Sequence, residues 1–368
     1  MDPLEIIRSR LICQRLAGKT FEQVTDAVGW LGAVQAQEFA EAKWSLAERV
    51  TDATDATVEN AFSSGDIIRT HALRPTWHFL ARDDARWILR LTKPRVHALN
   101  AYWYRKSELN GALFARAGDV FARALADGAH LTRPVLADRL SDAGINAAGP
   151  RLAYLLMHAE LEEQICSGPR RGRQHTYALF DNRVPTATHD DRDHETALDD
   201  LVHRYFRSHG PATVHDFTTW SSLPVRESRA SLERLGSRIE AVPDANGTKW
   251  YHAGHVASAS LPSKNTAAER LSGAFLLPTY DEMIVAYQDL RIVLDAALPR
   301  SDFIERAIVI DGTTVGTWKR TLSSRSAVVN ATLLRELSVD ENEALAAAVE
   351  RFGRFLGLPT TGESIVAV

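Results

Sequence analysis

Two glutamines, Gln35 and Gln37, lie one residue apart in the stretch WLGAVQAQEFAEAKWSL, which spans residues 30–46. An amide carbonyl oxygen accepts hydrogen bonds, and its dipole favours a nearby positive charge, so two converging amides can orient a water molecule. Neutral amides are not strong general bases at neutral pH, whereas carboxylates can be. The pair could therefore position water only in a reaction that needs no strong base.

The backbone decides whether both amides reach one ligand. An apolar helical stripe runs to Leu31, and in a continuing helix the two glutamine side chains would lie about 200° apart. Extended backbone near Ala36 would instead bring residues i and i+2 to one face. From the spacing alone we favour the alternative that Gln35 hydrogen-bonds in the core while Gln37 is an ordinary surface residue.

The elements around this pair repeat in one order. Three helices, a strand, a turn and a second strand form the order of a winged helix, which is clearest in the middle of the chain. There we predict helices at 119–127, 133–140 and 152–159, strands at 163–167 and 175–180, and the turn GPRRGRQ between the strands. The same order occurs before and after this region. The earlier copy has strands at 67–73 and 76–81. The later copy has strands at 238–242 and 248–253, joined by a turn at Asn246–Gly247.

From about residue 271 the pattern changes. Strands are predicted at 274–287 and 306–320, with Asp311–Gly312 as a hairpin turn, and a closing helix ends at Gly357. Asp281 and Glu282 would point to opposite faces of the first of these strands, which makes them poor acid/base partners for one bond. We expect a structural or substrate-positioning role for Asp281.

Together these patterns predict a helix-rich α+β fold with three tandem winged-helix units and a C-terminal α+β unit. A chain of 368 residues is long enough for several units with their own cores. The first unit contains both glutamines and an additional basic helix. The expected units are residues 1–110, 111–190, 191–260 and 265–368.

Composition excludes several classes of protein. The chain has 45% hydrophobic and 24% charged residues, as soluble globular proteins do, and no apolar run approaches the ~20 residues of a membrane span. We expect a cytoplasmic protein without membrane contact. Cys13 and Cys166 have no metal-ligand spacing and are expected to be small buried residues. For the tract HDDRDHE at 189–195 we favour a charged linker over a cation site.

Charge is unevenly distributed along the chain. The net charge is −4, but residues 69–106 carry nine Lys or Arg against Asp83 and Asp84, a sum of +7. Residues 38–66 carry seven acids against Lys43 and Arg49, a sum of −5. A chain polarised in this way can present one basic face to nucleic acid, and a solvated helix surface is the competing explanation.

Five motifs are specific when taken together: VQAQ, RTHALRPTWHFLA, HGPATVHDFTTW, LLPTYDEMIVAYQDLR and VIDGTTVGTWKR. They resemble those of the bacterial winged-helix DNA glycosylases of the AlkZ and YcaQ type, and the resemblance covers nearly the whole chain. The catalytic signature of that family is Gln, an apolar residue, then Gln or Asp, and it falls on Gln35, Ala36 and Gln37. The resemblance implies that both amides are catalytic, which reverses the preference drawn from spacing. The Gln-Gln form is that of the AlkZ-like branch.

The resemblance further implies a monofunctional DNA glycosylase that hydrolyses the N-glycosidic bond of bulky or cationic N7-alkylated purines and unhooks interstrand crosslinks. Such enzymes serve general repair or protect a toxin producer from its own product. Alkylation at N7 makes the base a cationic leaving group, so no general acid is needed, and amide oxygens can stabilise an oxocarbenium-like sugar and hold the attacking water. Because a crosslinked base cannot easily be flipped into a deep pocket, we expect an open DNA-binding cleft.

The expected partner is duplex DNA with alkylated or crosslinked purines, bound in the nucleoid by a monomer that needs no cofactor and no metal. Phosphate contacts are expected from the basic segment and the hairpins. The candidates, each equally well explained as a solvated surface charge, are Arg69, Arg74, Arg170, Arg171, Arg173, Lys319 and Arg320. For His71 and His78, on either side of the first hairpin turn, we expect hydrogen bonds within the hairpin and not catalysis.

The alternative is a tandem winged-helix transcriptional regulator without enzymatic activity. The array of three units permits it, whereas the Gln-Ala-Gln motif and the lack of an obvious effector or dimerisation segment argue against it. A protein that binds lesions without chemistry is also compatible with the sequence.

Overall fold

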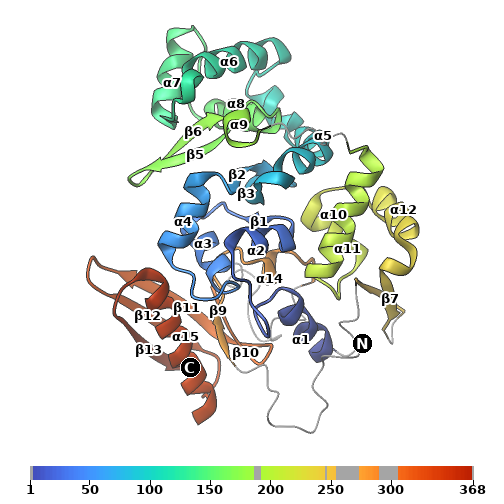
Figure 1. Ribbon diagram of the computed structural model, residues 1–368, viewed down its shortest axis with the longest axis vertical. Coiled ribbons are helices and arrows are strands. Elements are labelled where there is room, and N and C mark those ends of the chain that lie inside the picture. Colours follow the sequence, from blue (N-terminus) through green and yellow to red (C-terminus); the bar gives the residue numbers. More distant parts are fainter. Residues whose placement is uncertain (1–2, 186–191, 245–246, 254–272, 290–305, 367–368) are drawn as a thin grey trace.

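The structure is a computed structural model that describes residues 3–185, 192–244, 247–253, 273–289 and 306–366. It is a helix-rich α+β fold whose elements form four groups along the chain (Figure 1). The unit boundaries expected at 190 and at 260–265, part of the tract at 189–195, and Asn246 of the predicted turn lie outside the described residues.

The first group contains both glutamines and a three-stranded sheet in the order β1-β3-β2. The sequence patterns do not predict α4. This helix is capped by Thr54, whose hydroxyl accepts a hydrogen bond from the Thr57 N–H. Strands β2 and β3 pair around Arg74–Pro75 as expected. The elements are α1 Pro3–Cys13, α2 Val24–Leu31, β1 Val34–Gln35, α3 Phe39–Ala47, α4 Asp55–Ser64, β2 Ile67–Ala72, β3 Thr76–Ala81 and α5 Arg82–Lys106.

The second group lies at the top of Figure 1 and carries a β-hairpin. Its predicted turn GPRRGRQ is too long: β5 continues to Arg171, because Gly172, at φ 59°, and Arg173 suffice to reverse the chain. Arg170 and Arg171 therefore lie on a strand. The elements are α6 Gly111–Ala124, β4 Leu131–Thr132, α7 Arg133–Asp142, α8 Pro150–Leu161, β5 Ile165–Arg171, β6 Gln174–Leu179 and α9 Phe180–Arg183.

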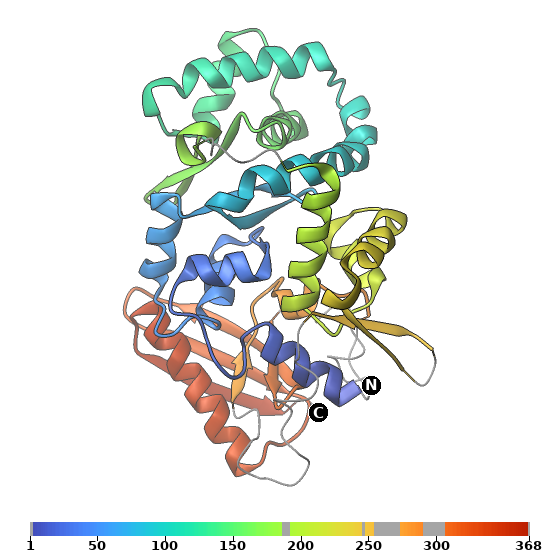
Figure 2. The same ribbon diagram turned by 45° about the vertical axis from the view of Figure 1, so that its right-hand side comes forward.

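The third group follows the same order of helices and hairpin. Thr213 caps α11 in a reciprocal pair with Asp216, in which the Thr213 hydroxyl accepts the Asp216 N–H and the Asp216 carboxylate accepts the Thr213 N–H. Figure 2 shows the β7–β8 hairpin projecting away from these helices. The elements are α10 His194–Ser208, α11 Val214–Ser221, α12 Val225–Leu235, β7 Glu240–Pro243 and β8 Lys249–His252.

The C-terminal group is a five-stranded sheet, in the order β13-β12-β11-β10-β9, covered by one long helix. The hairpin turn at Asp311–Gly312 is present, with positive φ at both residues, and the closing helix ends at Gly357, at φ 66°. The elements are β9 Ala274–Leu276, α14 Glu282–Val285, β10 Ala307–Ile310, β11 Thr313–Leu322, β12 Ala327–Leu333, α15 Val339–Leu356 and β13 Thr360–Val366.

The strand predicted at 274–287 is wrong beyond its first residues. Strand β9 ends at Leu276, and Tyr280 adopts the left-handed φ of 63°, which ends any extended run. The Asp281 carboxylate then accepts the Met283 N–H at 2.8 Å and caps the short helix α14. Local turn and cap chemistry outweighs the apolar pattern here, and it places Glu282 at the start of a helix.

The C-terminal group packs against the first group through Trp44 of α3. Trp44 is fully buried, lies 5.0 Å from the Phe352 ring and 5.1 Å from the Phe355 ring, and donates its indole N–H to Leu276 O at 2.7 Å. One core therefore contains side chains from α3, α15 and the five-stranded sheet.

The described residues include no helix both long and apolar enough to cross a lipid bilayer. Cys13 and Cys166 are both buried and free, as the sequence analysis expects.

We expect Phe352→Ala to lower the free energy of unfolding by about 3–5 kcal/mol, because its removal leaves a cavity beside Trp44. Denaturant unfolding of the full chain measures this change. Val339→Ala, at the exposed start of the same helix, is the control and should change the free energy by less than about 0.5 kcal/mol. Equal effects of the two substitutions would contradict a core shared with α3.

Candidate functional site

The glutamine pair lies where the chain has left helix α2: Gln35 ends strand β1, and Gln37 lies in the bend between β1 and α3. Helix α2 ends at Leu31 because Gly32 adopts a φ of 80°, and Val34 and Gln35 then pair with Phe79 and His78 of β3. The segment between α2 and α3 is therefore free of helical geometry at the position where the two amides would otherwise diverge.

Ala36 is held by hydrogen bonds on both of its backbone groups. Its N–H donates to Trp77 O at 2.7 Å, and its carbonyl accepts from Arg69 Nε at 3.0 Å. Ala36 is fully buried, whereas Gln35 and Gln37 on either side are both half-buried. The chain is therefore not helical between the two glutamines. The preference drawn from spacing placed Gln35 in the core and Gln37 on the surface, whereas both side chains are half-buried.

The Gln35 amide has a fixed orientation. Arg74 donates from one Nη to Gln35 Oε1 at 2.8 Å and from the other to Trp220 O at 2.7 Å. Because a guanidinium has only donors, the oxygen of the amide must face Arg74, and its NH2 group faces away. Gln37, by contrast, has no side-chain hydrogen bond to any other described residue.

His78 lies directly opposite Gln35 and supports Arg74. Its Nδ1–H donates to Thr76 O at 3.0 Å, which leaves Nε2 as the acceptor facing Arg74 at 3.3 Å. Burial, with the nearby Arg74 charge, lowers the pKa of His78 well below its ordinary value. The imidazole is therefore neutral, and its hydrogen bond within the hairpin is the one expected from the sequence.

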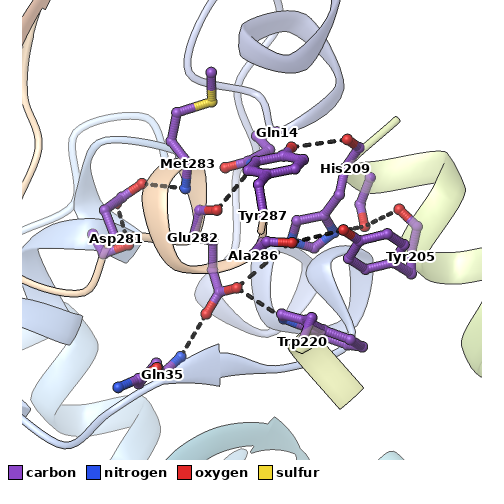
Figure 3. A network of polar contacts seen from close by, with 12 residues as sticks. Gln14, Gln35, Tyr205, His209, Trp220, Asp281, Glu282, Met283, Ala286 and Tyr287 are labelled. Carbon is purple, nitrogen blue, oxygen red and sulfur yellow. Dashed lines mark hydrogen bonds and ion pairs between the residues drawn. The ribbon is translucent and has the colours of Figure 1, made fainter. Parts of the chain in front are cut away.

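Glu282 is the residue that the sequence analysis missed. It is fully buried, and its Oε1 accepts the Gln35 backbone N–H at 2.7 Å while Oε2 accepts the Trp220 indole N–H at 3.0 Å (Figure 3). His209 Nε2 lies 3.6 Å from the same Oε2. The carboxylate thus joins β1, α10, α11 and the C-terminal group at one point.

A signal for Glu282 was present in the sequence. Pro278 followed by Asp281 is a turn and helix-cap pattern, which predicts a helix start and not a strand at residue 282. No local pattern predicts the contacts with Gln35 and Trp220, since they join segments 247 and 62 positions apart.

Asp281 has the structural role expected of it. It is fully buried and forms a two-armed ion pair with Arg49, with distances of 2.8 and 2.9 Å, and also accepts from Ser45 Oγ at 2.7 Å. Burial alone would raise the pKa of Asp281, but Arg49 holds this pKa below its ordinary value. The pair joins α3 to the C-terminal group.

His71 does not bond within its hairpin, contrary to the sequence-based expectation. Its Nδ1 donates to the buried carboxylate of Glu160 in α8, and Trp77 also donates its indole N–H to Glu160 at 3.3 Å. His71 and Trp77 point to the face of β2 and β3 opposite His78, and that face packs against the second group.

Four of the seven DNA-binding candidates are engaged inside the protein. Arg69 is 5% exposed, stacks over Trp77 at 4.4 Å, and burial lowers its pKa to about 10. Arg74 belongs to the glutamine network. Arg170 forms a two-armed pair with Glu59 of α4 at 2.8 and 2.6 Å, and Arg320 pairs with Glu41 of α3 at 2.5 Å.

The other three candidates are exposed. Arg171 donates to His130 O at 3.2 Å at the end of β5, Arg173 lies in the turn of the same hairpin, and Lys319 lies on β11. Arg173 and Lys319 have no ion-pair partner among the described residues.

Three possible metal ligands gather where α5 crosses α8. The ring nitrogens of His97 and His158 and an oxygen of Glu162 all lie within 4.8 Å of one another. Glu162, however, accepts from His97 Nε2 at 2.9 Å and from Lys93 Nζ at 3.0 Å. The Lys93 ammonium supplies the positive charge that a cation would bring, so the cluster is satisfied as an ion-pair network.

A profile of the family described as "DNA glycosylase AlkZ-like" matches residues 28–355, a range that contains Gln35, Gln37, Arg74 and Glu282. This match defines the class of the protein: it is a DNA glycosylase, an enzyme that cleaves the bond between a base and its sugar. Since the match extends over most of the chain, the chain belongs to the AlkZ-like DNA glycosylase family.

A similar protein agrees with this assignment, and a solved structure has the same fold. A Streptomyces sahachiroi protein described as "Interstrand DNA cross-link repair glycosylase" is 27% identical over 329 residues, which are 86% of this chain and 87% of that protein. The solved structure of "Streptomyces sahachiroi DNA glycosylase AlkZ" shares the fold, with a TM-score of 0.76 at 22% identity over 98% of this chain and 99% of that chain. The resemblance found in the sequence is confirmed. Membership of an enzyme family decides against a regulator without enzymatic activity.

The pH dependence of stability offers a test of the packing beside the glutamines. His175 of β6 lies edge-on to Phe39 at 4.9 Å, and burial, with the charges of Arg69 and Arg170, lowers its pKa to about 4. The unfolded chain, with an ordinary His pKa of about 6.5, binds the proton first. The free energy of unfolding should therefore fall as the pH is lowered from about 6.5 to 4.

We expect His175→Gln to remove about 1–2 kcal/mol of this pH dependence, a range reduced because the side chain is only partly buried. Denaturant unfolding at pH 7 and pH 4.5 measures the change. His194→Gln, at the exposed start of α10, is the control. An unaltered pH dependence in His175→Gln would contradict the packing described here.

Proposed function

We propose that this DNA glycosylase excises bulky or cationic N7-alkylated purines, with Gln35 and Gln37 as its catalytic residues. The observation that carries the proposal is that the chain is not helical at Ala36, so the half-buried glutamines on either side of this fully buried residue are not held about 200° apart. Both amides can then approach one sugar. The family profile spans both residues.

The chemistry follows from the charge of the damaged base. A purine alkylated at N7 departs as a neutral base once its glycosidic bond breaks, so the site needs no general acid. Gln37, without a protein partner among the described residues, has its carbonyl oxygen available to accept a hydrogen bond from the attacking water. Gln35 accepts from Arg74 with one lone pair, so its oxygen has a second for the same water or for the cationic sugar.

Crosslinked DNA is the proposed extension of this substrate class. The Streptomyces sahachiroi relative, whose similarity covers most of this chain, is described as an interstrand crosslink repair glycosylase. Both glutamines are partly exposed, which suits a nucleotide that remains in its duplex. The same activity would serve general repair or self-resistance.

For DNA binding we propose three winged helices, at 1–110, 111–190 and 191–260, and a C-terminal unit at 265–368 that together form the cleft. Each of the first three groups contains a two-stranded hairpin that follows several helices. Arg171, Arg173 and Lys319 are the proposed phosphate contacts because they are exposed on hairpins. The enzyme would act as a monomer on duplex DNA in the nucleoid.

Gln35→Ala and Gln37→Ala should each lower the rate of base release about 100-fold or more, because each removes an oxygen that stabilises the transition state. The measurement is single-turnover excision from duplex DNA with one N7-methylguanine, followed by alkaline cleavage of abasic sites. DNA affinity should persist. Gln23→Ala, an exposed glutamine before α2, is the control. Full activity in both variants would refute the catalytic assignment.

The salt dependence of DNA binding distinguishes exposed basic side chains from those that form ion pairs within the protein. Arg173→Ala and Lys319→Ala should each reduce the slope of log K against log salt by about 0.9, the value for one lost phosphate contact. Arg170→Ala is the matched comparison on the same hairpin, since its charge is already balanced by Glu59. It should lower stability and leave the slope unchanged. Fluorescence anisotropy over a salt series gives the slopes, and equal slopes in all three variants would contradict this division.

A further inference from the structure

Among the described residues, the buried Glu282 carboxylate forms no ion pair with an arginine or lysine. Among the described residues its nearest basic group is His209, at 3.6 Å, and burial lowers the pKa of His209, so this imidazole is neutral. Both oxygens instead accept from neutral donors, the Gln35 N–H and the Trp220 indole. Burial of a carboxylate whose hydrogen-bond donors are all neutral lowers the stability of the fold, which indicates that the residue has a functional role.

The backbone contact fixes the edge of the sheet at the glutamine pair. Strand β1 is an edge strand with β3 on one side only. At that edge the Gln35 N–H would have no partner within the sheet. Glu282 Oε1 accepts this N–H, at the position where a further strand would otherwise pair. The position of Gln35 along the edge is therefore set from the C-terminal group.

The side-chain contact is indirect and passes through Arg74. The Arg74 guanidinium is half-buried and orients the Gln35 oxygen at 2.8 Å. Burial lowers the pKa of Arg74, and the negative charge of Glu282 opposes this change. Glu282 thus balances the cation that holds the amide, and without that balance Arg74 would repel the positive charge that develops on the sugar.

We propose that Glu282 is a positioning residue for base excision, which acts on the Gln35 backbone directly and on the Gln35 amide through Arg74. The inference rests on the proposed catalytic role of Gln35. Glu282 itself is fully buried and touches no substrate. Its contribution should appear in the rate of the chemical step and not in the affinity for DNA.

Glu282→Gln tests the proposal at constant side-chain size. A glutamine offers one acceptor oxygen where the carboxylate offers two, so one of the two N–H donors meets an NH2 group, and the negative charge is lost. The single-turnover rate on N7-methylguanine DNA should fall about tenfold or more. The Kd for the same duplex, measured by fluorescence anisotropy, should change by less than about twofold, within the scatter of uncoupled sites.

Glu48→Gln is the matched control. Glu48 is also a buried glutamate between groups, and it accepts a backbone N–H, from Leu276 at 3.2 Å, and the Arg351 guanidinium at 2.8 Å. It has no contact with Gln35 or Arg74. Its loss should lower the melting temperature and leave the excision rate of the folded protein unchanged. An equal fall in rate for Glu48→Gln would overturn the proposal, because any buried glutamate would then have the same effect.

Arg74→Gln provides a second route if Glu282→Gln folds poorly. It should lower the rate without weakening DNA binding, since Arg74 acts on the same amide. In the double variant Arg74→Gln/Glu282→Gln the combined loss of rate should be smaller than the product of the two single losses, because part of the effect of Glu282 passes through Arg74. Strictly multiplicative losses would overturn the proposed route.

The outcomes separate this inference from the proposed function. If the wild-type chain is active, Gln35→Ala is inactive and Glu282→Gln is fully active, the inference is overturned and the catalytic assignment stands. A wild-type chain that releases no N7-methylguanine, or an active Gln35→Ala, would overturn the proposed function and this inference with it.

Discussion

The non-helical backbone at Ala36, between strand β1 and helix α3, is the constraint on which the candidate site depends. Hydrogen bonds to Trp77 O and from Arg69 Nε hold both backbone groups of this residue, and its methyl group is fully buried. If the segment were helical, the two amides would diverge by about 200° and could not share a ligand. Arg69 therefore serves the site from the opposite face of the sheet, as a donor to the backbone. The arrangement explains why a strand of only two residues lies between two helices.

The unevenly distributed charges of the sequence form ion pairs between groups of the fold. The acidic residues at 38–66 accept arginines from distant segments: Glu59 pairs with Arg170 from the second group, and Glu41 and Glu48 pair with Arg320 and Arg351 from the C-terminal group. These pairs tie the second and C-terminal groups to the first. The basic residues that remain exposed, such as Arg173 and Lys319, are fewer than the sequence suggests. The charge pattern thus reflects contacts between the groups of the fold as well as the surface of the protein.

Elements with strong local signals could be predicted from the sequence. The hairpin around Arg74–Pro75, the turn at Asp311–Gly312 and the helix ended by Gly357 are set by nearby residues, and all are present. The strand predicted through Glu282 is wrong, because a turn and a helix cap interrupt the apolar run. Contacts between groups could not be predicted, since Arg170 and Glu59 are 111 positions apart and no local pattern links them. The catalytic role of the glutamine pair was predicted from a family resemblance, because spacing alone could not show that the chain leaves helical geometry between the two residues.

The junction at Glu282 has a consequence for the protein during its synthesis on the ribosome. Both glutamines emerge early, and the first hairpin with Arg74 follows soon after them. Trp220 and Glu282 emerge only when most of the chain has been translated, and until then the edge N–H of Gln35 has no acceptor from the C-terminal group. If Gln35 has its proposed catalytic role, a nascent chain carries the motif before the Glu282 contact has formed, so an unfinished polypeptide is expected to excise bases more slowly than the complete protein.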